Sequence, residues 1–161
     1  MKPSVTENCL PIARRRVAAG LVLLLMLSAC SGPATDAEAE LREWLSTAQA
    51  AAEAKERRKL MSMISPAYSD ARGLDSDDVE NRFRLYFHRQ NVIRLLVSID
   101  EIRVIGDTAA VVDLTAGLTG TNDGALGFSA SAYRFELELE KADGDWELLS
   151  ARWGRLGDEV Y

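Results

Sequence analysis

Cysteine and histidine are scarce in this sequence, which contains two cysteines and one histidine among 161 residues. Cys9 and Cys30 both precede the part of the chain that we expect to fold, so that part has no disulfide, thiolate nucleophile or cysteine-ligated metal. A metal site would need carboxylates combined with the single histidine, His88. No such set occurs at metal-binding spacing, and no glycine-rich phosphate loop is present. We therefore expect neither a metal nor a cofactor.

An excess of positive charge is also missing. The chain has 19 lysine and arginine residues against 25 aspartate and glutamate residues, a formal charge of −6. Met1–Ala29 holds four of the basic residues and one of the acidic ones, so the remaining chain has a formal charge of −9. Such a domain does not attract phosphate backbones, and no nucleic-acid partner is expected. An anionic membrane surface would repel it as well.

One long apolar run stands near the N-terminus, from Val17 to Ala29, directly after three consecutive arginines that begin at Arg14. The run is shorter than the roughly 20 residues of a membrane-spanning helix. A basic region followed by a short apolar region is typical of a signal peptide. The run ends in Leu27-Ser28-Ala29-Cys30. This motif resembles the lipobox of bacterial lipoproteins, in which an aliphatic residue and two small residues precede a cysteine that becomes lipidated.

The lipobox predicts removal of Met1–Ala29, a lipid on Cys30 and a short linker over residues 30–35. Two or three acyl chains anchor a protein stably, because each buried methylene contributes about 0.8 kcal/mol. The membrane partner is then reached through Cys30. Ser31 follows the cysteine in place of aspartate, which favours the outer membrane, with the protein facing the periplasm. An ordinary secretory peptide and a signal anchor are the alternatives.

Residues 36–161 are expected to form one domain that begins with helices. Thr35 and Glu38 make a capping box for the first helix. Its apolar side chains recur at helical spacing; they are Leu41, Trp44, Leu45, Ala48 and Ala52. The late basic residues are expected to complement the dipole at the C-terminus of that helix; they are Lys55, Arg57, Arg58 and Lys59.

Two further helices follow in the pattern. Leu60–Ile64 suggests a short one that Pro66 ends, and the segment from Tyr68 to Gly73 reads as a turn. Asp75 or Ser76 caps the third helix, with acidic residues in its first turn. Its apolar side is formed by Val79, Phe83, Tyr86, Phe87 and Gln90, and its opposite side by Arg82, Arg84 and Arg89.

From Asn91 onward the pattern alternates with a period of two, which predicts four antiparallel strands. The first runs from Ile93 and shifts phase near Asp100-Glu101, as a β-bulge would. Gly106-Asp107 is a turn, Ala109–Leu118 a central strand and Thr119–Gly127 a glycine-rich loop. The third strand, Tyr133–Glu140, joins the last strand, Trp146–Leu156, through a turn at Asp143-Gly144. Helices first and strands after them predict an α+β domain.

The segments Ser65–Gly73, Tyr86–Gln90, Tyr133–Leu139 and Gly144–Trp146 resemble the nuclear transport factor 2-like superfamily (SnoaL-like and cystatin-like cones), and within it small proteobacterial lipoproteins. The resemblance implies a cone in which a bent four-stranded antiparallel sheet wraps an N-terminal helix. The superfamily includes isomerases, dehydratases, cyclases and binding domains, so the fold does not assign an activity.

The resemblance also implies where functional groups would lie, namely inside the cone. Asp113 could serve there as a general base if it points inward, and His88 is the second catalytic candidate; an outward Asp113 and a surface His88 are the simpler alternatives. Pocket-lining candidates are Trp44, Tyr68, Phe87 and Tyr133, although filled core is the simpler explanation for such aromatic residues.

Three hypotheses remain open at this stage. The first, which we prefer, is a lipid-anchored envelope protein whose non-catalytic domain binds a small apolar ligand or an envelope protein. The second is a small isomerase- or dehydratase-like enzyme that uses an interior acid or base. The third is a structural component that acts as a homodimer through the outer face of its sheet.

Overall fold

The computed structural model describes residues 36–121 and 128–158, with the side chains of residues 128 and 129 left aside. Thr35–Tyr161 forms a compact unit distinct from Met1–Ala34. The signal peptide, Cys30 and the capping residue Thr35 lie outside the described residues. Within the described part of the chain, no helix has the length and apolar character needed to cross a membrane.

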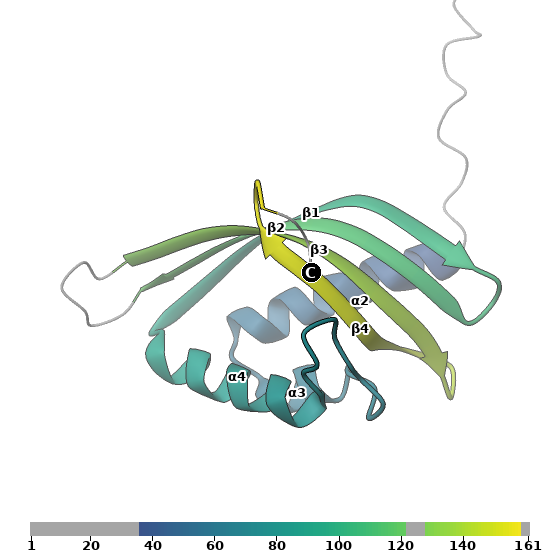
Figure 1. Ribbon diagram of the computed structural model, residues 1–161, viewed down its shortest axis with the longest axis horizontal. Helices are drawn as coiled ribbons and strands as arrows, with labels where there is room; N and C mark the ends of the chain where they lie inside the picture. Colours follow the sequence, from purple (N-terminus) through teal and green to yellow (C-terminus); the bar gives the residue numbers. More distant parts are fainter. Residues whose placement is uncertain (1–35, 122–127, 159–161) are drawn as a thin grey trace, which may run out of the picture. The chain divides into compact units, whose positions relative to one another are not determined.

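Three helices precede four strands, as the sequence predicts, and this confirms the α+β class (Figure 1). The helices are α2 (Asp36–Glu53), α3 (Arg57–Met61) and α4 (Ser76–Arg89). The strands are β1 (Val92–Ile105), β2 (Ala109–Thr121), β3 (Phe128–Ala142) and β4 (Asp145–Arg155). They form one antiparallel sheet in the order β1-β2-β3-β4, so β2 is central, as expected.

The predicted turns and the predicted bulge are confirmed. The β1–β2 register shifts between Ile99 and Glu101. Gly106 has a φ of 63°, and Asp143 and Gly144 have φ values of 51° and 96°, the left-handed geometry of a tight hairpin. The start of the glycine-rich loop was predicted wrongly, because β2 continues to Thr121. Pairing of Gly120 with Ile93 on one side and residue 129 on the other outweighs the low strand propensity of glycine.

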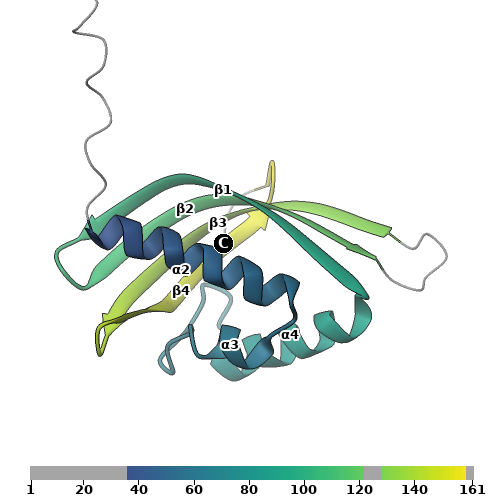
Figure 2. The same cartoon turned by 180° about the vertical axis from the view of Figure 1, so that it is seen from behind.

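Helix α2 lies against the concave face of the curved sheet (Figure 2). Leu41 and Val112 are fully buried where helix and sheet meet, because both belong to the apolar sides of their elements. The core continues through Leu45, Leu114, Leu137, Leu139 and Trp146.

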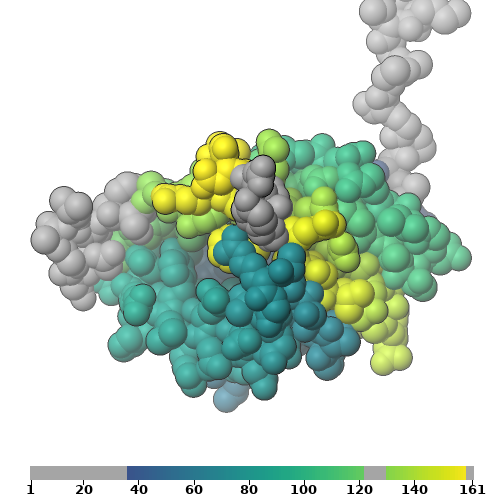
Figure 3. All heavy atoms as spheres, viewed as in Figure 1, coloured from purple at the N-terminus to yellow at the C-terminus, as the bar shows by residue number. Residues whose placement is uncertain are grey.

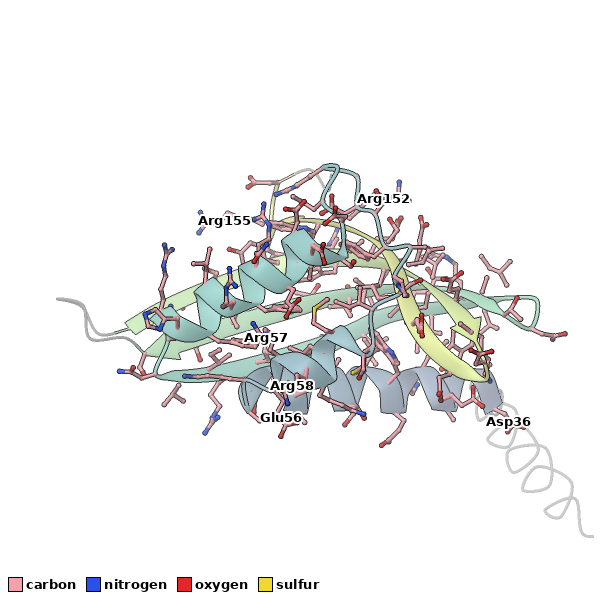
Figure 4. All side chains as sticks on the ribbon, turned by 90° about the horizontal axis from the view of Figure 1, so that it is seen from below. Asp36, Glu56, Arg57, Arg58, Arg152 and Arg155 are labelled. Carbon is pink, nitrogen blue, oxygen red and sulfur yellow. The ribbon has the colours of Figure 1, made fainter. Side chains whose placement is uncertain are left out.

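The basic residues after α2 do not stabilise its C-terminus, contrary to the sequence prediction. The helix ends at Glu53, and its last turn holds no basic residue. Lys55 adopts a φ of 59°, which turns the chain, and its ammonium donates to the backbone carbonyl of Gln90. Arg57 and Arg58 belong to α3, at the end of α2 far from Asp36 (Figure 4).

Helix α4 begins as expected but packs loosely. The carboxylate of Asp75 accepts a hydrogen bond from the backbone N–H of Asp78 at 2.9 Å, and the two residues form a capping box. None of the α4 side chains is fully buried, although the sequence gives the helix an apolar side. The space between this helix and the sheet is therefore incompletely filled.

Candidate functional site

The concave side of the sheet holds an apolar cavity of about 240 Å³, which we call the inner chamber. Helix α2 supplies Trp44, Leu45, Ala48, Gln49 and Ala52, and the remaining wall comes from α3 and its following loop, from Phe83, and from all four strands, including Leu95, Val97, Leu114, Phe135 and Leu137. No lining side chain is titratable. Two lining residues carry a polar side-chain group: the amide of Gln49 donates to the carbonyl of Leu95 at 3.0 Å, and the indole N–H of Trp44 is buried without a hydrogen-bond partner among the described residues. The chamber therefore offers contact surface and no group for proton transfer.

A second cavity, of about 480 Å³, lies between α4, the end of α2 and strands β1 and β2; we call it the outer cavity. Its apolar wall is formed by Ala52, Phe83, Leu85, Phe87, Ile93, Leu95 and Leu118, and its polar members are Arg82, Tyr86 and Arg89. Ala52, Phe83 and Leu95 line both cavities, so the two adjoin. The space-filling view shows a recess between α4 and β4 (Figure 3).

Aromatic side chains pack against one another in the cavity walls and beside them. Phe83 and Phe87, one turn apart on α4, stack with ring centroids 5.7 Å apart. On the sheet, Tyr133 meets Trp153 edge to face at 5.9 Å. Burial, together with the nearby Tyr133, raises the pKa of Tyr86, so its hydroxyl stays protonated and able to donate.

The structure places two of the four predicted pocket residues in the cavity walls and the other two outside them. Trp44 lines the inner chamber and Phe87 the outer cavity. Tyr68 is only 5% exposed, belongs to the core and lines neither of these two cavities. Tyr133 packs against Phe135 and Trp153, beside the two cavities and outside their linings.

The two catalytic candidates lie away from both cavities. Asp113 is on the convex face, because its neighbours Val112 and Leu114 point into the core, and its carboxylate accepts a hydrogen bond from Arg103 at 2.5 Å. His88 is exposed on α4 and lines neither cavity. The structure therefore supports the alternative in which Asp113 points outward from the sheet. No group of three potential ligands suited to a metal ion occurs among the described residues.

The sequence placed Arg82 and Arg89 on the side of α4 away from its apolar residues, and this was wrong. Both line the outer cavity, next to Leu85 and Tyr86. Residues 82, 85, 86 and 89 follow a spacing of three and four, and that spacing was a usable signal. It was missed because the apolar residues Phe83 and Phe87 defined a neighbouring side of the same helix.

A polar groove beside Trp44 and Trp146 was also not predicted. Glu40 accepts hydrogen bonds from Lys141 at 2.5 Å and from the indole of Trp146 at 2.9 Å. These two bonds lower the pKa of Glu40. The carboxylate of Glu40 is therefore already engaged within the groove.

Solved structures share this architecture at low sequence identity. A candidate scytalone dehydratase from Novosphingobium aromaticivorans is 10% identical, with a TM-score of 0.67 over 90% of each chain. A candidate calcium/calmodulin dependent protein kinase II association domain from Xanthomonas campestris is 19% identical, with a TM-score of 0.65 over 81% of this chain and 95% of that one. A candidate dehydratase of the NTF2-like family from Streptomyces avermitilis is 16% identical, with a TM-score of 0.64 over 76% and 98%.

The structural similarity establishes a shared fold. At such low sequence identity it does not assign an activity. No protein-family profile matches the sequence, and no curated protein matches it either.

Proposed function

Because the chain has the nuclear transport factor 2-like fold, we propose that it is a lipid-anchored envelope protein whose domain binds a small apolar molecule without transforming it. The observation that carries this proposal is the inner chamber, an apolar space of about 240 Å³ with no titratable side chain in its wall. Apolar cavities with few polar groups are typical of ligand sites.

An isomerase- or dehydratase-like reaction is the alternative, and it needs an acid or base that reaches the ligand. Asp113 is bonded to Arg103 on the other face of the sheet, and His88 is exposed outside both cavities. Tyr86 lines the outer cavity and has a raised pKa, so its phenol stays protonated. A protonated phenol alone cannot act as a general base. Binding is the function that this arrangement favours.

The anchoring part of the proposal rests on the lipobox that ends at Cys30. Growth of producing cells with radiolabelled or azide-bearing palmitate should label the full chain, and Cys30→Ala should abolish the label. Cys9→Ala is the matched control, because Cys9 lies in the segment that is removed. Labelling that persists in Cys30→Ala would refute the lipid anchor. Fractionation of inner and outer membranes then tests the proposed outer-membrane location.

Binding can be tested on the unit Thr35–Tyr161, which has its own hydrophobic core. The neutral fluorophore N-phenyl-1-naphthylamine should bind saturably, because its fused rings match an apolar cavity. Ala48→Leu and Ala52→Leu place added volume inside the lining and should weaken binding roughly ten-fold or more. Ala39→Leu adds the same volume at an exposed position of α2 and should leave the affinity unchanged.

Circular dichroism and urea unfolding establish that each variant is folded before its affinity is compared. Absence of saturable binding to the folded wild-type unit, or equal affinity in the folded filling variants, would overturn the proposed function.

A further inference from the structure

The second half of α4 is positively charged in a domain that is otherwise acidic. From Asn81 to Arg89 the helix carries Arg82, Arg84 and Arg89 and no aspartate or glutamate, whereas the chain after Ala29 has a formal charge of −9. Such a local reversal of charge stands out because it coincides with the outer cavity, which Arg82 and Arg89 line. The net negative charge of the domain repels anions at long range, and the arginines of this helix face attract them locally.

The arginines around the cavity differ in whether they are already paired. Arg84 donates to the side-chain oxygen of Asn81 at 2.8 Å. Arg57 lies 3.3 Å from Glu80, and Arg94 lies 3.9 Å from Glu53. The guanidinium groups of Arg82 and Arg89, by contrast, have no hydrogen bond or ion pair with any residue in the described ranges 36–121 and 128–158.

Two carboxylates on the helices that form the cavity wall are engaged by other groups. One oxygen of Glu53 accepts from the backbone N–H of Leu95 at 2.8 Å, while the other faces Arg94. Glu80 faces Arg57. Two guanidinium groups with all their donors available therefore stand beside an apolar cavity, and guanidinium groups bind carboxylate, sulfate and phosphate oxygens in pairs of hydrogen bonds.

We propose that the ligand is an anionic amphiphile whose charged group binds Arg82 and Arg89 while its apolar body fills the outer cavity and reaches the inner chamber. This inference rests on the proposed binding function and adds the chemical class of the ligand. The two arginines are seven residues apart, about 10.5 Å along the helix axis, so they flank the opening on both sides of Leu85 and Tyr86. The protonated Tyr86 hydroxyl adds a donor between them.

A matched pair of fluorophores tests the anionic preference on the unit Thr35–Tyr161. N-phenyl-1-naphthylamine and 8-anilino-1-naphthalenesulfonate share the anilinonaphthalene body, and only the second carries a negative charge. The wild type should bind the sulfonate roughly ten-fold more tightly than the neutral amine, as expected for hydrogen bonds to a charged group. The preference should fall with added salt, because the arginines are exposed.

Three variants separate the charge effect from the apolar effect. Arg82→Gln and Arg89→Gln should each reduce the preference for the sulfonate, and the double variant should abolish it, with the affinity for the neutral amine unchanged. Arg84→Gln is the matched control, since Arg84 lies on the same helix and outside the cavity lining. It should leave both affinities unchanged.

Competition then identifies the source of the anion. Dodecanoate represents a lipid-derived carboxylate and 2-naphthoate a soluble aromatic one, with dodecanol and 2-naphthalenemethanol as their uncharged counterparts. Displacement of the sulfonate by either acid more readily than by its alcohol supports the proposal. The acid that displaces the sulfonate at the lower concentration then identifies the source of the anion.

Two results would overturn this inference while leaving the proposed function intact. One is equal affinity of the wild type for the charged and neutral fluorophores. The other is a preference for the sulfonate that survives the double arginine variant. Failure of both fluorophores to bind would instead refute the proposed function itself.

Discussion

Arg103 on β1 donates a hydrogen bond to the carboxylate of Asp113 on β2 at 2.5 Å, across the convex face of the sheet. The same guanidinium nitrogen is 2.5 Å from Glu101, so one arginine serves two carboxylates. The hydrogen bond that Arg103 donates to Asp113, followed by the one it donates to Glu101, raises the pKa of Arg103. Asp113 therefore belongs to a surface ion-pair group, and its carboxylate is turned away from the cavities.

Replacement of Asp113 with asparagine should have little effect. The ion pair is partly exposed, so Asp113→Asn should lower the free energy of unfolding by about 1 kcal/mol or less. Affinity for both fluorophores should stay at the wild-type value, because Asp113 touches neither cavity. Urea unfolding and fluorescence titration measure the two quantities. Loss of binding in the folded variant would show that Asp113 acts on the ligand site.

Truncation of Leu41 should be costly. Leu41 is 0% exposed between α2 and the sheet, and Leu41→Ala should lower the free energy of unfolding by about 2–5 kcal/mol. Leu96→Ala removes the same atoms from a residue that is 78% exposed and should change it by about 0.5 kcal/mol at most. Similar losses in the two variants, measured by urea unfolding, would contradict the position of the core.

Removal of the α4 cap should weaken both stability and binding. Asp75→Ala deletes the acceptor for the N–H of Asp78 and should cost about 1 kcal/mol. The outer cavity should lose affinity for the fluorophores as well, because α4 forms one of its walls. Asp77→Ala, in the same turn and without a cap bond, should cost less. An Asp77 variant that is as unstable as the Asp75 variant would argue against the cap.

Tyr68 should make the domain sensitive to high pH. Burial, with a smaller contribution from Asp70, raises the pKa of Tyr68 to about 12 from the ordinary value of 10. The unfolded chain therefore loses this proton first, so stability is full below about pH 10 and declines as the pH rises toward 12. The free energy of unfolding should fall more between pH 9 and pH 11.5 in the wild type than in Tyr68→Phe. Equal losses in the two proteins would assign the decline to other groups.

Local rules were sufficient for most of the backbone. Asp75 was predicted as a cap, the bulge near Asp100-Glu101 as a phase shift, and Asp143-Gly144 as a hairpin turn, because each depends on residues adjacent in the sequence. The prediction failed for Lys55 and Arg57. Lys55 adopts a left-handed backbone conformation that changes the direction of the chain before α3, and composition does not reveal this. The prediction failed again at Gly120, where pairing within the sheet extends a strand through glycine.

The sequence by itself determined the order of helices and strands, the acidic charge and the expectation of a lipid on Cys30, because periodicity, composition and a short motif carry that information. Only the tertiary structure decided which face Asp113 occupies, that Arg82 and Arg89 border a cavity, and that the aromatic residues of α4 leave space beneath them. These properties depend on how far apart two packed elements stand. That distance is set by the sum of many side-chain contacts from residues remote in the sequence, and no local pattern encodes it.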